Sequence, residues 1–220
     1  MQGRGGRGRP GPAPRHDRPM ATSIDLPHPS TVVPGGATEH APAMLRPLIR
    51  ADRLRARVRQ LGHRLARDLA GYHPDHPPML LALLDGSFCF VADLARCIPL
   101  PDLRLTFLRT SSYGHSTISS GVVSLGALPE CRQRAVVVVD DILDTGRTLH
   151  TVCSALREAG AASVRTCVLL DKPARREIFD GSGPVKADYV GFTIPDRFVV
   201  GYGLDFAGQY RHLPDVCVVE

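Results

Sequence analysis

Three carboxylates follow a short apolar run in the middle of the chain. Val136–Val139 is wholly apolar, Asp140 and Asp141 come next, and Asp144 follows after two more apolar residues. The sequence then continues as Thr-Gly-Arg-Thr over residues 145–148. In an open α/β sheet, ligands bind beyond the carboxyl ends of the strands, and a helix N-terminus favours an anion. Because carboxylates can hold ribose hydroxyls or Mg²⁺, this arrangement predicts a site for a ribose phosphate.

A structural explanation of the same acids is also open. Asp140 and Asp141 would then merely end a strand, and Asp144 would cap the helix that follows. Three carboxylates crowded into one turn repel each other, which favours a binding site over a purely structural purpose. The turn lacks the G-x-x-x-x-G-K-[ST] pattern, which argues against a P-loop NTPase.

The segment Asp140-Asp-Ile-Leu-Asp-Thr-Gly-Arg-Thr148 resembles the phosphoribosyl-pyrophosphate motif of the type I phosphoribosyltransferases. The aspartate directly before Thr-Gly is similar to the hypoxanthine-guanine branch of that superfamily. The resemblance implies that Asp140 and Asp141 hold the ribose hydroxyls, directly or through Mg²⁺. It implies that Asp144 faces the imidazole side of a purine, as general base or as stabiliser of charge on the ring. It assigns the 5′-phosphate to the four residues of the turn, Thr145, Gly146, Arg147 and Thr148.

Lysine is rare in this chain, since only Lys172 and Lys186 occur. The segment Leu170–Pro173, together with Arg175 and Arg176, resembles the next block of the same family. This resemblance implies that Lys172 donates to the exocyclic oxygen of a 6-oxopurine. An ammonium group is a donor only, so this contact favours hypoxanthine, guanine or xanthine over adenine. A solvated surface lysine is the alternative, and the scarcity of lysine argues against it.

The segment 188–214 is a second strong match to this branch. It implies that the Phe198 ring stacks on the purine and that the backbone of Val199 meets the edge of the base. It also implies that Asp205 coordinates Mg²⁺ and that the planar guanidinium of Arg211 binds pyrophosphate. The alternatives are a core position for Phe198 and a surface ion pair between Asp205 and Arg211.

Two further loops resemble parts of the family. Ser112-Tyr113-Gly114 resembles the mobile lid that shields the reacting ribosyl centre from water, or is simply a flexible loop. Asp85 and Gly86 stand where relatives bind pyrophosphate through an unusual cis peptide and a Lys or Arg side chain. A carboxylate should repel that anion, so we expect the replacement of Asp85 by lysine to lower the Michaelis constant for the donor.

Helical and extended patterns alternate between residues 44 and 220. Apolar residues spaced three and four apart predict a helix over 51–69. Further helices are expected over 87–97 and from the Thr-Gly turn to about residue 159. Strands are expected at the apolar segments 48–49, 79–84, 103–108, 135–139, 163–170 and 187–192. Continuous apolar strands indicate a parallel sheet covered by helices on both faces. The fold class is therefore α/β, and the resemblance implies a type I phosphoribosyltransferase fold with a small hood formed by the chain ends.

The bulk composition sets the remaining expectations. Of the 220 residues, 1–43 are rich in Gly, Pro and Arg, so we expect a disordered tail followed by a phosphoribosyltransferase domain at 44–220. The G-x-G-x-x-G match at Gly3 has no strand before it and carries no function. No apolar run reaches eighteen residues, which excludes a membrane span. The six scattered cysteines form no zinc-like pairs and suggest a reducing cytoplasm.

Taken with the resemblance, these patterns predict a Mg²⁺-dependent purine-salvage enzyme. It would transfer the phosphoribosyl group of phosphoribosyl pyrophosphate to hypoxanthine, and to guanine. A xanthine-preferring enzyme and a regulatory RNA-binding protein on the same scaffold are the alternatives. We expect a homodimer or homotetramer in the cytoplasm, with no membrane partner and no specific nucleic acid.

Overall fold

A computed structural model describes residues 44–112, 123–179, 181 and 183–220. The predicted tail at 1–43 and the lid residue Tyr113 lie outside this part of the chain. The helices are α1 (Ala51–Asp68), α2 (Phe88–Arg96) and α3 (Arg147–Glu158), with a 3-10 turn at Pro173–Arg175. The strands are β1 (Leu45–Ile49), β2 (Met79–Leu84), β3 (Arg104–Ser112), β4 (Val123–Leu125), β5 (Ala135–Leu143), β6 (Ser163–Asp171), β7 (Tyr189–Thr193), β8 (Val199–Val200) and β9 (Val216–Val219).

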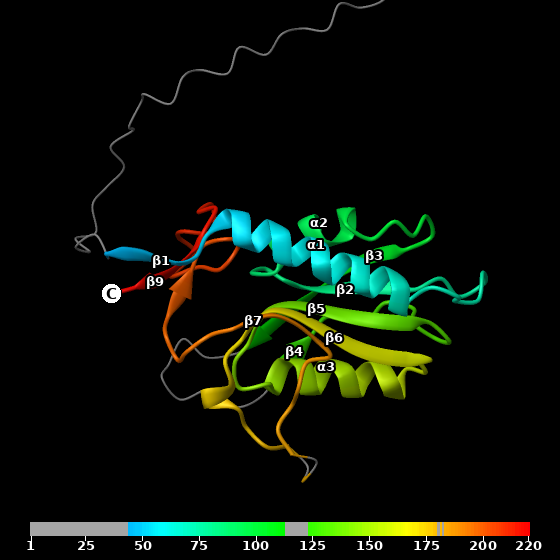
Figure 1. Ribbon diagram of the computed structural model, residues 1–220. Helices are drawn as coiled ribbons and strands as arrows, with labels where there is room; N and C mark the ends of the chain where they lie inside the picture. The colour runs from blue at the N-terminus through cyan, green and yellow to red at the C-terminus, as the bar shows by residue number, and fades with distance from the viewer. Residues whose placement is uncertain (1–43, 113–122, 180, 182) are drawn as a thin grey trace, which may run out of the picture. The chain divides into compact units, whose positions relative to one another are not determined.

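The strands form two separate sheets (Figure 1). The larger sheet has the order β4-β3-β2-β5-β6-β7, in which all neighbours are parallel except β3 and β4. The smaller sheet, β1-β9-β8, is antiparallel and joins the first described strand to the last. The α/β class, the mainly parallel sheet and the hood are therefore confirmed.

Two hydrophobic cores cover the two faces of the large sheet. Residues alternate between the faces of a strand, so Leu80 and Ala82 of β2 pack toward α1 and α2. Leu81 and Leu83 pack toward α3 on the other face. Figure 1 shows this layering, with α1 and α2 on one side of the sheet and α3 on the other. Full burial of each leucine side chain contributes about 1.5–3 kcal/mol to the stability of the fold. The helices on both faces therefore fix the position of β2 and of the loop at its end.

Strand β5 is longer than its apolar run predicts. The expected end was Val139, but the strand continues through Leu143. Pairing with β2 does end at Val139, whereas pairing with β6 continues as far as Leu143 and Asp171. Because backbone pairing does not require apolar side chains, Asp140 and Asp141 lie inside the last part of the strand, not beyond it.

Strand β3 also extends beyond its expected end at residue 108. β3 extends to Ser112, and Thr110 pairs with Leu125 at the start of an antiparallel β3–β4 arm. Polar side chains do not prevent this pairing, because strands pair through their backbone groups. The β3–β4 pairing begins after Arg109, the last residue of β3 that pairs with β2. In the part of the chain shown by the structure, no helix is long and apolar enough to cross a membrane.

Candidate active site

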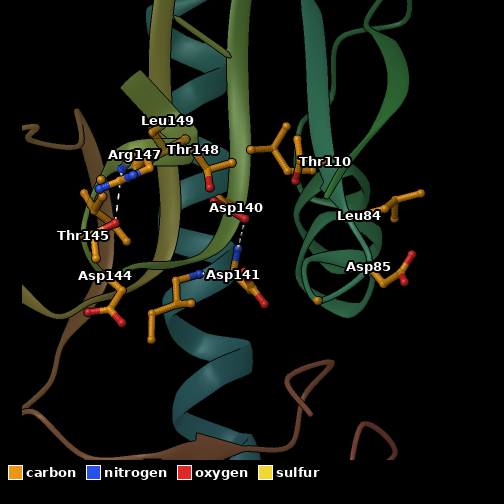
Figure 2. Close-up of a pocket in the computed structure, with 15 residues that line it drawn as sticks. Leu84, Asp85, Thr110, Asp140, Asp141, Asp144, Thr145, Arg147, Thr148 and Leu149 are labelled. Atoms are coloured by element: carbon orange, nitrogen blue, oxygen red, sulfur yellow. Dashed lines mark hydrogen bonds between the residues drawn. The ribbon is translucent and has the colours of Figure 1, made fainter. Parts of the chain in front are cut away.

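The turn between β5 and α3 forms one side of a cavity of about 280 Å³ (Figure 2). Gly146 immediately precedes α3, and its φ of 91° lies in the left-handed region that favours glycine. A Cβ on this glycine would also lie 3.0 Å from the Cβ of Val185. The Arg147 N–H donates to Thr145 Oγ1 at 3.3 Å and tightens the turn. Since the first N–H groups of a helix lack partners within the helix, this turn can receive a phosphate.

Asp140 and Asp141 line the same cavity at the end of β5. Loss of hydration raises the pKa of the Asp140 carboxyl well above its ordinary value, and the charge of Asp141 raises it further. Loss of hydration also raises the pKa of Asp141, while its hydrogen bonds with Asp140 and with backbone amides, and to a smaller extent the nearby Arg211 guanidinium, oppose that rise. The Asp141 and Ile142 amides donate to these two carboxylates at 3.0 and 2.9 Å. Two crowded carboxylates of this kind favour a cation or hydroxyl donors between them.

Asp144 does not cap α3, because the residue at the cap position is Gly146 and the cap has no side-chain hydrogen bond. Its Oδ2 lies 3.6 Å from Lys172 Nζ and 3.5 Å from Arg175 Nη1. Its Oδ1 is shielded from solvent and has no hydrogen-bond partner among the described residues. Buried acceptors are normally satisfied, so this carboxylate retains accepting capacity for a ligand. The capping explanation of Asp144 is therefore wrong.

A second cavity of about 260 Å³ adjoins the first and contains Lys172. The lysine side chain is only 7% exposed, and its Nζ also lies 3.2 Å from Asp196 Oδ1. A buried ammonium group needs charged or hydrogen-bonding partners, and the two carboxylates supply them. The surface-lysine alternative is therefore wrong.

Phe198, Val199 and Asp205 line the same second cavity. Val199 is buried in β8, whereas the Phe198 side chain is 53% exposed and is not a core residue. The Phe206 ring meets the Phe198 ring edge-on, with 5.4 Å between centroids. An exposed aromatic ring beside a cavity offers one face for stacking.

The loop at Gly86, which lines the first cavity, meets the loop at Gly203. The Leu84–Asp85 peptide bond is cis. A Cβ on Gly86 would lie 1.7 Å from Asp141 Oδ2, so the backbone of this loop lies directly against that carboxylate. Gly203 has a φ of 102°, and a Cβ there would lie 2.2 Å from the Gly86 carbonyl oxygen. Close backbone approach therefore couples the 84–87 loop to the loop that carries Asp205.

Asp205 and Arg211 form the ion pair that was the alternative to their functional roles. Arg211 Nη2 lies 2.8 Å from Asp205 Oδ1, and Arg211 Nη1 donates to the Gly203 carbonyl at 2.7 Å. Asp205 Oδ2 also accepts the Gly208 N–H at 2.7 Å. The Arg211 guanidinium is close enough to Asp141 to affect the pKa of that carboxyl, and Asp205 lines the second cavity.

Sequence reasoning placed Arg175 in the Lys172 block but gave it no role, and it missed Asp196. Arg175 pairs with Asp144 and Asp196 pairs with Lys172, and both contacts join residues far apart in the chain. The Tyr202 hydroxyl donates to Asp93 Oδ2 at 2.6 Å and fixes the Asp205 loop to α2. The available signal was proximity in the sequence to other predicted site residues: Arg175 follows Lys172 closely, and Asp196 precedes Phe198 closely. Ser112 ends β3, while the rest of the predicted lid lies outside the described residues.

Comparison with known proteins agrees with this arrangement. A family model described as a phosphoribosyl transferase domain matches residues 51–207. The chain is 40% identical over 169 residues to a hypoxanthine phosphoribosyltransferase of Buchnera aphidicola subsp. Schizaphis graminum, covering 76% of this chain and 91% of that protein. The crystal structure of a hypoxanthine-guanine phosphoribosyltransferase from Bacillus anthracis is similar with a TM-score of 0.69 and 36% identity. That similarity covers 80% of this chain and 97% of the other.

A longer relative contains a matching segment. The bifunctional protein TilS/HprT of Listeria monocytogenes serotype 4b is 39% identical over 177 residues, which cover 79% of this chain. The chain spans about a quarter of the length of that relative, 26%. From the family model and the extent of these similarities, the chain belongs to the phosphoribosyltransferase family, in its hypoxanthine-guanine branch.

Proposed function

We propose that this protein transfers the 5-phosphoribosyl group of phosphoribosyl pyrophosphate to an imidazole nitrogen of hypoxanthine or guanine, as a step of purine salvage. One observation carries the proposal: the two cavities share Asp141, Ile142 and Asp144. The first cavity is built to receive a phosphate, and the second contains the buried donor Lys172. A ribosyl phosphate and a 6-oxopurine would therefore meet at Asp144. The names of the relatives support the same substrates.

In this reaction the turn before α3 binds the 5′-phosphate, and Asp140 and Asp141 bind the ribose hydroxyls. Arg211 and the loop at Gly86 bind pyrophosphate. The bond between ribose C1 and the pyrophosphate oxygen breaks, and a bond from C1 to the imidazole nitrogen forms. Asp144 accepts the proton that this nitrogen loses. Positioning and fixed charges supply most of the catalysis.

Mg²⁺ belongs to the proposal. Mg²⁺ keeps several waters and is usually held by one or two carboxylates and by substrate phosphates, and Asp140 and Asp141 offer such carboxylates in the first cavity. Asp140 and Asp141 would hold the ion on the ribose side, and Asp205 would hold it on the pyrophosphate side. Bound there, Mg²⁺ would neutralise charge on the departing pyrophosphate.

A turnover assay tests the proposal. Phosphoribosyl pyrophosphate and Mg²⁺ are supplied with hypoxanthine, guanine, xanthine or adenine, and nucleotide formation is measured with and without EDTA. We expect turnover with hypoxanthine and guanine that EDTA abolishes. Activity only with adenine, or with no base, contradicts the proposal. A strong preference for xanthine would favour the xanthine enzyme, and specific RNA binding at physiological salt without turnover would favour the RNA-binding regulator.

The two lysines of the chain provide a matched test of base recognition. Lys172→Gln replaces a charged donor in the second cavity and should raise the KM for hypoxanthine by about tenfold or more. Lys186 is exposed and lies outside that cavity, so Lys186→Gln should leave this KM within about twofold. Equal effects of the two substitutions on steady-state kinetics would show that Lys172 does not contact the base.

We also propose a homodimer or homotetramer in the cytoplasm. All six cysteines are free thiols, as expected for a reducing compartment. Leu105 and Phe107 lie on one face of β3 and are 41% and 50% exposed, which provides apolar surface for a second copy of the chain. Light scattering during size-exclusion chromatography measures the mass, and a monomer at micromolar concentration contradicts the oligomer.

A further inference from the structure

Asp85, in the loop after β2, forms an ion pair with Arg109 of the neighbouring strand β3. Asp85 stands in the loop where the resemblance implies a lysine or arginine. Arg109 Nη2 lies 3.0 Å from Asp85 Oδ1, and both side chains are more than half exposed. The pairing of the sheet brings them together, because Leu84 of β2 is the register partner of Arg109 on β3. The cation absent from the loop therefore occurs on the neighbouring strand.

The Asp85 carboxylate lies on the side of the loop away from the other acids. Asp85 is among the residues that line the first cavity, but in Figure 2 its carboxylate points away from Asp140 and Asp141. Thr110 lines the first cavity, and successive side chains of a strand point to opposite faces, so its neighbour Arg109 is directed elsewhere. Toward the cavity the loop presents the backbone at Gly86, where no Cβ would fit.

The charge of the site makes the position of this carboxylate important. Besides Asp85, three acids line the first cavity, Asp140, Asp141 and Asp144, and the donor itself carries several negative charges. The nearby cations are shared with acids: Arg147 with Glu177, and Arg211 with Asp205. A free Asp85 carboxylate that turned toward the cavity would add repulsion against the bound anion, and dissolved salt would weaken that repulsion.

We propose that Arg109 is a positioning residue for the pyrophosphate end of the site. Its guanidinium neutralises Asp85 and keeps the carboxylate on the side of the loop away from the other acids, so that the anion meets backbone instead of a negative side chain. The proposal rests on the proposed function, because it assumes that pyrophosphate binds at this loop. It does not require Arg109 to touch the substrate.

Calorimetric titration with Mg²⁺ and inorganic pyrophosphate tests the proposal without relying on turnover. Arg109→Ala should weaken pyrophosphate binding by about fivefold, and the defect should shrink as salt screens the released carboxylate. In the assay, the KM for the donor should rise by a similar factor while kcat and the KM for hypoxanthine change little. Arg104→Ala is the matched control, because Arg104 is exposed at the opposite end of β3.

The double variant Asp85→Asn/Arg109→Ala separates positioning from a direct contact. If Arg109 acts through Asp85, removal of the carboxylate restores binding to within about twofold of the wild type. Arg109→Lys keeps a cation and should bind nearly as well as the wild type. Unchanged binding by Arg109→Ala, or a double variant as weak as Arg109→Ala, overturns the proposal. If the wild type binds pyrophosphate but turns over no base, the proposed function fails while the role of Arg109 stands.

Discussion

The two oxygens of Asp144 have unlike surroundings. Oδ2 lies beside the cations Lys172 and Arg175, whereas Oδ1 has no hydrogen-bond donor in the described part of the chain. A carboxylate held through one oxygen is fixed in place and keeps the other for a ligand. This asymmetry suits a group that takes a proton from a bound base.

Asp144→Asn keeps the size of the side chain but removes its proton-accepting charge. We expect kcat to fall by about a hundredfold to ten-thousandfold, the usual contribution of general base catalysis. Donor affinity, measured by calorimetry, should change far less. A pure loss of donor binding with normal kcat would show that the role is misassigned.

At the level of elements, the end of β5 places two repelling carboxylates where only β6 still pairs with the strand. Burial and the charge of Asp141 raise the pKa of Asp140, so the folded protein binds this proton more tightly than the unfolded chain. This group therefore favours the folded state at low pH, and the contribution is lost as pH rises through the raised pKa.

Asp140→Asn should consequently stabilise the protein at neutral pH while weakening donor binding. We expect the melting temperature at pH 7 to rise by about 2–4 °C, and the gain to disappear as the pH is lowered. Asp75→Asn is the control, because the Asp75 side chain is 81% exposed. A lower melting temperature of Asp140→Asn at pH 7, measured by calorimetry, would contradict this account.

The contact between the two glycine loops predicts a second effect at this scale. Gly203→Ala combines a φ of 102° with a Cβ 2.2 Å from the Gly86 carbonyl oxygen, so the loops must separate. The kcat/KM for the donor should fall about tenfold to a hundredfold. Gly71 has a similar φ of 83° with nothing within 4 Å of its Cβ position, and Gly71→Ala should leave kcat/KM nearly unchanged. Equal kinetics for the two variants would mean that the loop contact does not matter.

For the whole molecule, the described residues from 44 to 220 form one compact unit that includes every side chain placed in the site. Removal of residues 1–40 should therefore leave the melting temperature within about 2 °C and kcat/KM within about twofold. Thermal melts and steady-state kinetics of the shortened and full-length proteins check this. A clear loss of either quantity would assign a structural or functional role to the first forty residues.

The sequence predicted those parts of the molecule that depend on neighbouring residues. The apolar run of β2 and the periodicity of α1 indicated their elements to within one residue, and the site residues on β5 and its turn are contiguous. β4, β8 and β9 were not predicted, because strands of two to four residues exist only through their partners. The pairs Asp85–Arg109 and Lys172–Asp196 were also missed, since each joins segments that meet only in the folded sheet.

The continued pairing of β5 with β6 has a consequence for how this protein tolerates change in length. Asp140 pairs with Val168 and Ile142 with Leu170, and neighbouring side chains face opposite sides of the sheet. A single-residue insertion or deletion directly before Asp140 would exchange the faces of the two aspartates if the core valines keep their register, or the faces of the valines if the aspartates keep theirs. Surface loops such as 71–78 have no comparable register to lose. Along this chain, β5 should therefore be the segment least able to absorb a change in length.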